Sequence, residues 1–151
     1  MESRGEVLNQ FLVEVFGQIL KAEAACLAGK DLSLQELHLI DAVCRAVDQG
    51  RDNRSTAIAA ALGITAGTLT SAVNLLEKKG YLLRRRDERD KRVVHLLPTE
   101  QGRAADARHR DFHRQMVAHV LDGLTDEEAE CTLRALGRVA EFFRRGAPER
   151  G

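Results

Sequence analysis

The sequence predicts a mainly α-helical fold that carries one small β-hairpin. Apolar residues recur at spacings of three and four over most of the 151 residues, which is the period of amphipathic helices. Between residues 81 and 97 this pattern gives way to two short runs rich in Leu and Val around a polar segment, which is typical of a hairpin. We therefore expect one domain, residues 1–151, with helices on both sides of the hairpin.

Two helices are predicted before residue 50. The first spans residues 7–28, where Gly29 is a suitable stop. Ser33 and Glu36 have the spacing of a capping box, so a second helix is expected at residues 34–48.

Two short helices follow, and a glycine-containing turn separates them. The first covers residues 56–62 and ends at Gly63, and the second covers residues 66–79. Thr65 is a good N-cap for the second helix, and Gly80 is a good C-terminal stop. This arrangement indicates a helix-turn-helix.

The hairpin comes directly after the helix-turn-helix. Its predicted strands are residues 81–86 and 92–97, with a polar loop between them, and Pro98 ends the second strand. We therefore expect a winged helix-turn-helix over residues 34–98.

The last two helices are predicted from their caps. Thr99 caps a helix that runs to about residue 121, and Thr125 with Glu128 forms the capping box of the final helix, which frays from about residue 144. The apolar faces of helices 7–28 and 100–145 exceed what the small winged unit can cover. The chain is therefore expected to form a homodimer through this helical region.

Basic residues concentrate around the hairpin, although the whole chain has no net charge. Lys plus Arg and Asp plus Glu both total 23, which taken globally argues against a nucleic-acid partner. Residues 78–92, however, hold eight basic and three acidic residues, a local charge of +5, so the remainder carries −5. Because salt screens charges beyond about 8–10 Å, phosphate binding needs only such a local patch. Double-stranded DNA is therefore the expected partner.

The helix at residues 66–79 carries short uncharged polar side chains that can reach base edges or phosphates. Thr68, Ser71 and Asn74 recur at spacing three and form the predicted groove-facing set. Thr70 lies towards a flank, where it would meet phosphate.

Arg89 at the hairpin tip suits the minor groove, and a pair between Asp90 and Arg92 would hold that tip. The complete predicted DNA-binding set is Ser55, Thr65, Thr68, Thr70, Ser71, Asn74, Lys78, Arg86, Arg89, Asp90 and Arg92.

Five segments together resemble the MarR family of winged helix-turn-helix regulators. They lie at residues 57–64, 67–70, 76–81, 89–92 and 97–102. The resemblance implies a homodimer that binds a palindromic operator, with helix 66–79 in the major groove and loop 87–92 in the minor groove.

Shorter motifs are similar, within that family, to the FabT-type repressors of fatty-acid synthesis genes. They lie at residues 33–41, 67–70, 112–117 and 123–128. The likeness implies a repressor for which long-chain acyl-acyl carrier protein is the corepressor, and a basic dock for the acidic carrier at Arg103, Arg108, Arg110 and Arg114. The predicted effector pocket consists of Phe16, Ile19, Leu20, His38, His109, Phe112, His113 and Met116.

Zinc remains an alternative effector. His109 and His113 are four residues apart on one predicted helix, a spacing at which two imidazoles can share a metal. Zinc-sensing members of the resembled family use ligands from comparable regions, which gives an alternative ligand set of Glu23, Cys26, His38, His109 and His113. In the other interpretation these histidines are polar members of the effector or dimer region, and no cofactor is bound.

The three cysteines are widely separated and odd in number, so we expect reduced thiols rather than a disulfide framework. Cys26 has Lys21 and Lys30 nearby in sequence, which leaves a peroxide-sensing thiol as a further alternative to a packed helix cysteine.

Enzymatic and membrane functions are not expected. The sequence lacks a nucleophile elbow, a phosphate loop, an HExxH motif and a dinucleotide fingerprint. No apolar run approaches the roughly 18–20 residues of a membrane span, and the N-terminus lacks the apolar core of a signal peptide. We therefore expect a cytoplasmic transcription regulator, with a non-enzymatic interaction module as the other class.

Overall fold

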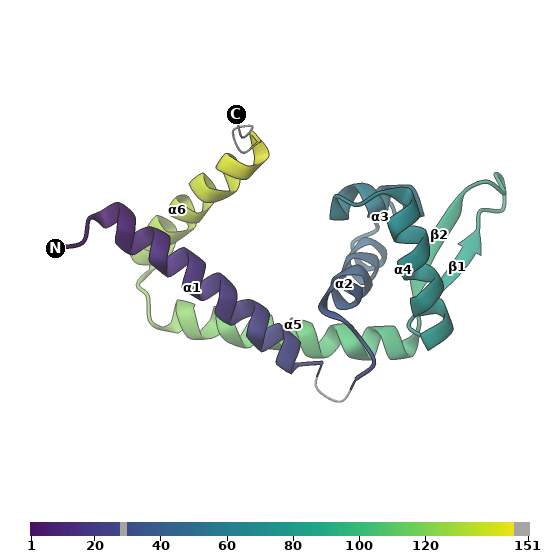
Figure 1. Cartoon of the computed structure of the whole chain (residues 1–151), viewed down its shortest axis with the longest axis horizontal. Coiled ribbons are helices and arrows are strands. Elements are labelled where there is room, and N and C mark those ends of the chain that lie inside the picture. Colours follow the sequence, from purple (N-terminus) through teal and green to yellow (C-terminus); the bar gives the residue numbers. More distant parts are fainter. Residues whose placement is uncertain (28–29, 147–151) are drawn as a thin grey trace. The chain divides into compact units, whose positions relative to one another are not determined.

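The computed structural model describes residues 1–27 and 30–146, and Figure 1 shows its helices and its one hairpin. The elements are α1 (Arg4–Ala25), α2 (Leu34–Asp48), α3 (Ser55–Leu62), α4 (Ala66–Lys79), β1 (Leu82–Arg86), β2 (Val94–Pro98), α5 (Glu100–Asp122) and α6 (Asp126–Arg144). This confirms the predicted mainly helical fold with a β-hairpin wing. The chain divides into two compact units, Met1–Asp111 and Phe112–Gly151, and the predicted winged unit of residues 34–98 lies within the first.

The predicted helix starts at residues 34, 66 and 126 coincide with local caps. The Ser33 hydroxyl accepts the Glu36 backbone N–H at 3.2 Å, and the Glu36 carboxylate accepts the Ser33 N–H at 2.9 Å. Thr125 and Glu128 repeat this capping box at 3.2 and 2.8 Å. The Thr65 side chain caps α4. Each cap satisfies backbone donors that a helix start leaves unpaired.

The first helix begins three residues before the predicted start at residue 7, so that prediction is wrong. Helix α1 begins at Arg4, because Ser3 and Glu6 form a capping box with bonds of 2.7 and 3.2 Å. The apolar period begins only after this turn, so periodicity alone misses it. At the other end Cys26 is the C-cap of α1, and the predicted stop at Gly29 lies outside the described residues. The predicted frayed tail lies outside them from residue 147.

The hairpin is antiparallel, and its register runs from Leu82 opposite Pro98 to Arg86 opposite Val94. Proline has no backbone N–H to donate, and at the last position of β2 it interrupts no hydrogen bond between the two strands. Leu82 and Leu96 are fully buried and anchor the hairpin to the core.

The core of the first unit lies among α2, α3, α4 and the base of the hairpin. The most deeply buried side chains are Leu37, Ile40, Val43, Cys44, Leu69, Val73, Leu76, Leu82 and Leu96. Helix α3 ends at Gly63 and α4 ends at Gly80, with φ angles of +66° and +88° that favour glycine. The two helices meet at 109° across their turn, which fixes the direction in which α4 leaves the core.

No single helix within residues 1–27 and 30–146 is long and apolar enough to cross a membrane. The α3–α4 pair reaches that length and hydropathy only when its bent halves are joined.

Candidate nucleic-acid interface

The outer face of α4 is set by the side chains that the helix buries. Leu69, Val73 and Leu76 are 0–2% exposed, which confirms the predicted inward set. At about 100° per residue, Ser71 and Lys78 fall opposite this buried stripe. Both side chains are exposed. They therefore form the middle of the surface that α4 presents.

The predicted groove-facing set extends from the middle of that surface to both of its flanks. Thr68 and Ser71 line a groove of about 550 Å³ on the side of α2. Thr70 and Asn74 line a second groove of about 360 Å³, together with Ser55 and residues of the hairpin. Spacing three drifts about 60° around a helix at each step, so Thr68 and Asn74 lie on either side of Ser71 on this exposed face. Their joint contact with one DNA groove stays a prediction.

Two predicted threonines have structural roles within α4. The Thr65 hydroxyl accepts the Thr68 N–H at 3.1 Å and donates to the Thr68 hydroxyl at 2.9 Å. The Thr70 hydroxyl donates to the Ala66 carbonyl oxygen at 2.9 Å. Both hydroxyl protons are thus used inside the helix, which leaves lone pairs as their external hydrogen-bonding capacity.

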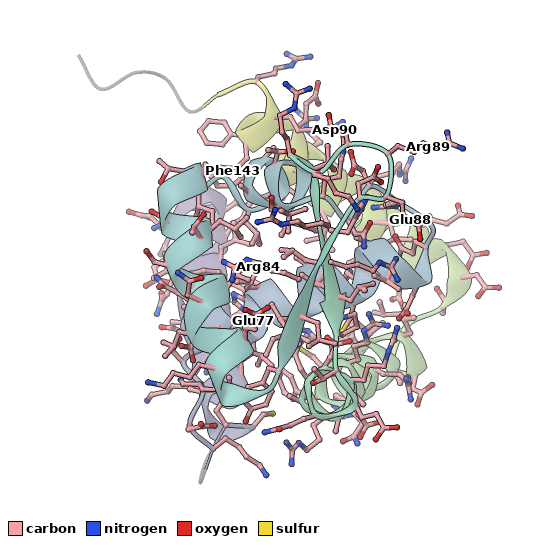
Figure 2. The ribbon with its side chains drawn as sticks, turned by 90° about the vertical axis from the view of Figure 1, so that its right-hand side faces the viewer. Glu77, Arg84, Glu88, Arg89, Asp90 and Phe143 are labelled. Carbon is pink, nitrogen blue, oxygen red and sulfur yellow. The ribbon has the colours of Figure 1, made fainter. Side chains whose placement is uncertain are left out.

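Arg84 joins the hairpin to α4, a role that the sequence analysis missed. Its guanidinium donates to the Thr70 carbonyl oxygen at 3.2 Å and to the Glu77 carboxylate at 3.3 Å, while its backbone N–H donates to Glu77 at 3.0 Å. Figure 2 shows Glu77 and Arg84 between α4 and β1. The available signal was the period of two along β1, which places Arg84 on the same side as buried Leu82.

The tip of the hairpin is built on one carboxylate. Asp87 accepts the backbone N–H groups of Arg89 and Asp90 at 2.9 and 3.0 Å. Hydrogen bonds from the Asp90 backbone, the His95 side chain and the Arg89 backbone lower the pKa of Asp87. Arg92 forms the predicted pair with Asp90, at 3.1 and 3.2 Å. The tip is therefore an ordered turn that leaves the Arg89 side chain exposed, as Figure 2 shows.

A concave surface of about 450 Å³ lies beside this tip. It is lined by Arg85, Arg86, Asp87, Glu88, Arg89 and His95. The three arginines are exposed and give this surface the positive charge that phosphate binding requires. Predicted Arg86 and Arg89 are thus brought together, and Arg85 joins them.

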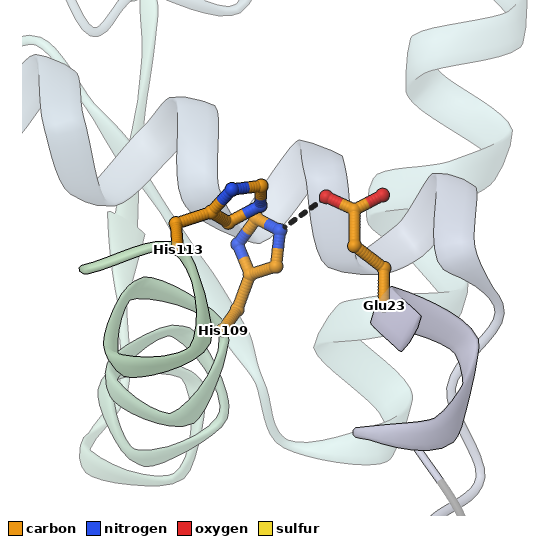
Figure 3. A group of neighbouring side chains, drawn as sticks. All are labelled: Glu23, His109 and His113. Carbon is orange, nitrogen blue, oxygen red and sulfur yellow. Dashed lines mark hydrogen bonds and ion pairs between the residues drawn. The ribbon is translucent and has the colours of Figure 1, made fainter. Parts of the chain in front are cut away.

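A second polar cluster joins α1, α2 and α5 within the first unit. The Glu23 side chain is 5% exposed; its carboxylate lies 2.8 Å from His109 Nε2 and 3.3 Å from His38 Nε2. Figure 3 shows the Glu23–His109 contact, with His113 four residues further along α5. A carboxylate flanked by two imidazoles is a donor set that suits zinc. Cys26, at the end of α1, is half-buried.

A buried acidic pair lies beside this cluster. Burial, helped by a hydrogen bond that the protonated Asp106 carboxyl donates to Asp41, raises the pKa of Asp106 to about 6. Arg110 Nε lies 2.7 Å from Asp106 and 3.8 Å from Asp41. Burial and the Asp106 charge raise the pKa of the Cys44 thiol to about 12, so Cys44 has none of the thiolate character of a reactive cysteine.

The predicted effector-pocket residues are divided between the two units. On α1, Phe16 is 63% exposed, while Ile19 and Leu20 are half-buried. Phe112 and Met116 belong to the second unit and are half-buried. A pocket that includes all of them stays a prediction.

Known proteins with the same architecture are DNA-binding regulators. The model of the MarR family matches residues 45–94. FabT of Streptococcus pneumoniae, solved in complex with DNA, is 35% identical, with coverage of 91% of this chain and 96% of that chain and a TM-score of 0.81. MepR of S. aureus, also solved with DNA, is 21% identical, covers 87% and 96% with a TM-score of 0.67, and supports the fold alone.

Curated relatives agree with this placement. The HTH-type transcriptional regulator YcgE of Bacillus subtilis is 31% identical over 54% of this chain and 53% of its own length. The repressor YetL of the same organism is 27% identical over 57% and 52%. The chain spans about half the length of these curated relatives, which are transcription regulators rather than enzymes. The chain belongs to the MarR family of winged helix-turn-helix transcription regulators.

Proposed function

We propose that this chain is a homodimeric repressor that binds a palindromic operator and controls fatty-acid synthesis genes. The observation that carries DNA binding is the exposed polar face of α4, tied through Arg84 to a wing whose tip exposes Arg89. Helix α4 would read base edges in the major groove while Arg89 enters the minor groove. Two copies would reach major grooves about 34 Å apart, one turn of DNA.

Operator binding tests this part directly. A palindromic A·T-rich duplex, titrated with the full chain at two salt concentrations, should bind more tightly at the lower salt and in preference to a scrambled duplex. The salt dependence reports phosphate contacts, and the preference reports base or shape recognition. Equal binding of both duplexes at every salt concentration would refute a sequence-specific regulator and favour an interaction module.

Exposed apolar side chains support the second copy. On α1 they include Val7, Leu8, Phe11, Val13 and Phe16, each more than half exposed. On α6 they include Leu133, Leu136, Phe142 and Phe143, also more than half exposed. Faces of this kind mark protein interfaces. Sedimentation that shows a stable monomer at micromolar concentration would contradict the dimer.

The similarity to FabT supports fatty-acid control. In this proposal a long acyl chain, delivered by acyl carrier protein, occupies an apolar pocket beside α1 and strengthens operator binding. Two of the arginines predicted to bind the acidic carrier already have an acidic partner, because Arg103 and Arg110 both pair with Asp48, at 2.9 and 3.3 Å. Arg108 is exposed on the same helix.

The test is operator affinity with and without acyl-acyl carrier protein. Tighter binding with a long-chain acyl carrier, but not with the unacylated carrier, is the expected result. Arg108→Glu should weaken that effect and leave basal affinity unchanged. An acyl carrier that changes nothing would refute this effector.

A specific observation also favours a zinc-responsive regulator as second candidate. Glu23, His38 and His109 converge within the first unit, and His113 follows His109 by one helical turn. Zinc would bind these oxygen and imidazole ligands and fasten α1 to α2 and α5. Zinc should then raise operator affinity, and the His109→Ala/His113→Ala double variant should lose the response. An unchanged affinity in saturating zinc would exclude this candidate.

A further inference from the structure

His95 on β2 fastens the wing to the loop between α2 and α3. We propose that His95, in its doubly protonated form, is the positioning residue that holds the wing for minor-groove contact, so that operator affinity falls as the imidazole loses its second proton. This inference rests on the DNA binding proposed above.

One side of the His95 ring faces an acceptor whose orientation is fixed. Asn53 Nδ2 donates to the Leu96 backbone carbonyl oxygen at 2.9 Å, and the Leu96 N–H donates to the Asn53 backbone carbonyl oxygen at 2.9 Å. Turning the amide over would set its oxygen against the Leu96 carbonyl, so the Asn53 amide has one orientation. Asn53 Oδ1 therefore faces His95 Nδ1, at 3.0 Å.

The other side of the ring faces a carboxylate. His95 Nε2 lies 3.1 Å from Asp87 Oδ1, while Asp87 Oδ2 accepts the N–H groups of Arg89 and Asp90. These bonds lower the pKa of Asp87, so its carboxylate is ionised near neutral pH and can only accept. Both ring nitrogens of His95 thus face acceptors.

A neutral imidazole carries one N–H and can satisfy only one of these acceptors, whereas an imidazolium carries two and satisfies both. The His95 side chain is 24% exposed, so most of the ring lies against protein, and Asn53 and Asp87 are its fixed partners. Loss of a proton therefore breaks one link of the chain Asn53–His95–Asp87. Either loss removes one of the two side-chain hydrogen bonds by which His95 joins the Asp87 turn, which presents Arg89, to the loop between α2 and α3.

Other charged groups face His95 from the neighbouring elements. Arg85 lies opposite it on β1, and Arg86, Glu88 and Arg89 share its concave surface. These three arginines are exposed, where water and salt screen their repulsion.

From the loop between α2 and α3, Arg54 forms a backbone bridge to His95, and Asp52 neutralises the Arg54 guanidinium at 2.5 Å. DNA phosphates beside this surface would add negative charge and favour the imidazolium further. Proton binding and DNA binding are then linked, and each strengthens the other.

The experiment measures operator affinity from pH 6 to pH 8 at constant ionic strength. The full-length chain is titrated into a palindromic duplex that the wild-type protein has selected from a random pool. Wild-type affinity should be about tenfold higher at pH 6 than at pH 8, the size of one hydrogen bond to a charged group. His95→Gln should lose most of the pH dependence that the wild type shows, because glutamine does not titrate. His119→Gln, an exposed histidine on α5, is the matched control and should keep the wild-type profile.

A second measurement separates this inference from the proposed function. Nitrogen–proton correlation spectra of the free protein should show N–H signals on both ring nitrogens of His95 at pH 6, and Asp87→Asn should weaken them. A His95→Gln variant with the wild-type pH profile, or a singly protonated His95 at pH 6, would overturn the inference. Absence of DNA binding at every pH would overturn the proposed function and this role with it, while the spectra would still report the state of the ring.

Discussion

Gly102 allows α5 to begin directly against the end of the helix-turn-helix, and replacing it tests that packing. A Cβ built at Gly102 would lie 2.2 Å from the Tyr81 carbonyl oxygen and 3.2 Å from its carbon. That oxygen is held in place, because it accepts the N–H and the hydroxyl of Thr99, each at 3.1 Å. The obstacle is therefore backbone that cannot move without losing its own hydrogen bonds.

Two opposing terms set the size of the Gly102→Ala effect. Helix propensity alone would stabilise the variant by about 1 kcal/mol. Overpacking costs about 1–3 kcal/mol, and each displaced hydrogen bond to Tyr81 adds about 1 kcal/mol. We expect a net loss of about 2 kcal/mol in the free energy of unfolding.

Gly67→Ala is the matched control, because a Cβ there meets nothing within 4 Å. It should stabilise the protein by up to about 1 kcal/mol. Urea unfolding followed by circular dichroism, at one fixed protein concentration, measures both variants. A Gly102→Ala variant as stable as Gly67→Ala would refute the packing argument. Since Gly67 lies on the outer face of α4, its added methyl group should also weaken operator binding in a protein that is no less stable.

Three further predictions follow from charge and burial. Arg89→Ala should lower the salt dependence of operator binding by about two ions per bound dimer, one from each wing, measured as the slope of log affinity against log salt; an unchanged slope would place Arg89 away from phosphate. The raised pKa of Asp106, about 6 against 3.8 unfolded, means that wild-type stability falls as pH rises from about 4 to about 6. Asp106→Asn should therefore be more stable than wild type at pH 7, by at most about 3 kcal/mol, and should lose that advantage below about pH 4 in urea titrations. Native protein should react with a thiol reagent at exposed Cys131 but not at Cys44, which reacts only after unfolding; fast modification of Cys44 would contradict its burial.

The elements that could be predicted from the sequence are those that local chemistry determines. Ser33, Thr65 and Thr125 cap helices through bonds that span three residues, so a short pattern contains the whole signal. The same pattern at Ser3 and Glu6 was present but lay before the apolar period began. Helix α1 therefore starts earlier than periodicity indicates.

The binding surface was predictable only in part, because its organising contacts join distant residues. Leu69, Val73 and Leu76 reveal the inner side of α4, and this gives the outer side by geometry. The contact between Asn53 and His95, however, spans 42 residues, and no spacing rule connects them. The sequence predicts the wing from its charges, but only the folded structure shows the contacts that hold the wing in place.

Helix α2 is the element through which either proposed effector would reach the DNA-binding surface. Its N-terminal half bears His38, which contacts Glu23 of α1, and its C-terminal Asp48 holds Arg103 of α5. The same helix packs against α3, which leads through the turn into α4, and against β2, which is one strand of the wing. A zinc ion at Glu23, or an acyl chain beside α1, therefore needs no contact with α4 to change DNA binding. It need only favour one position of α2, because the buried side chains of α2 move as a packed body with the helix-turn-helix.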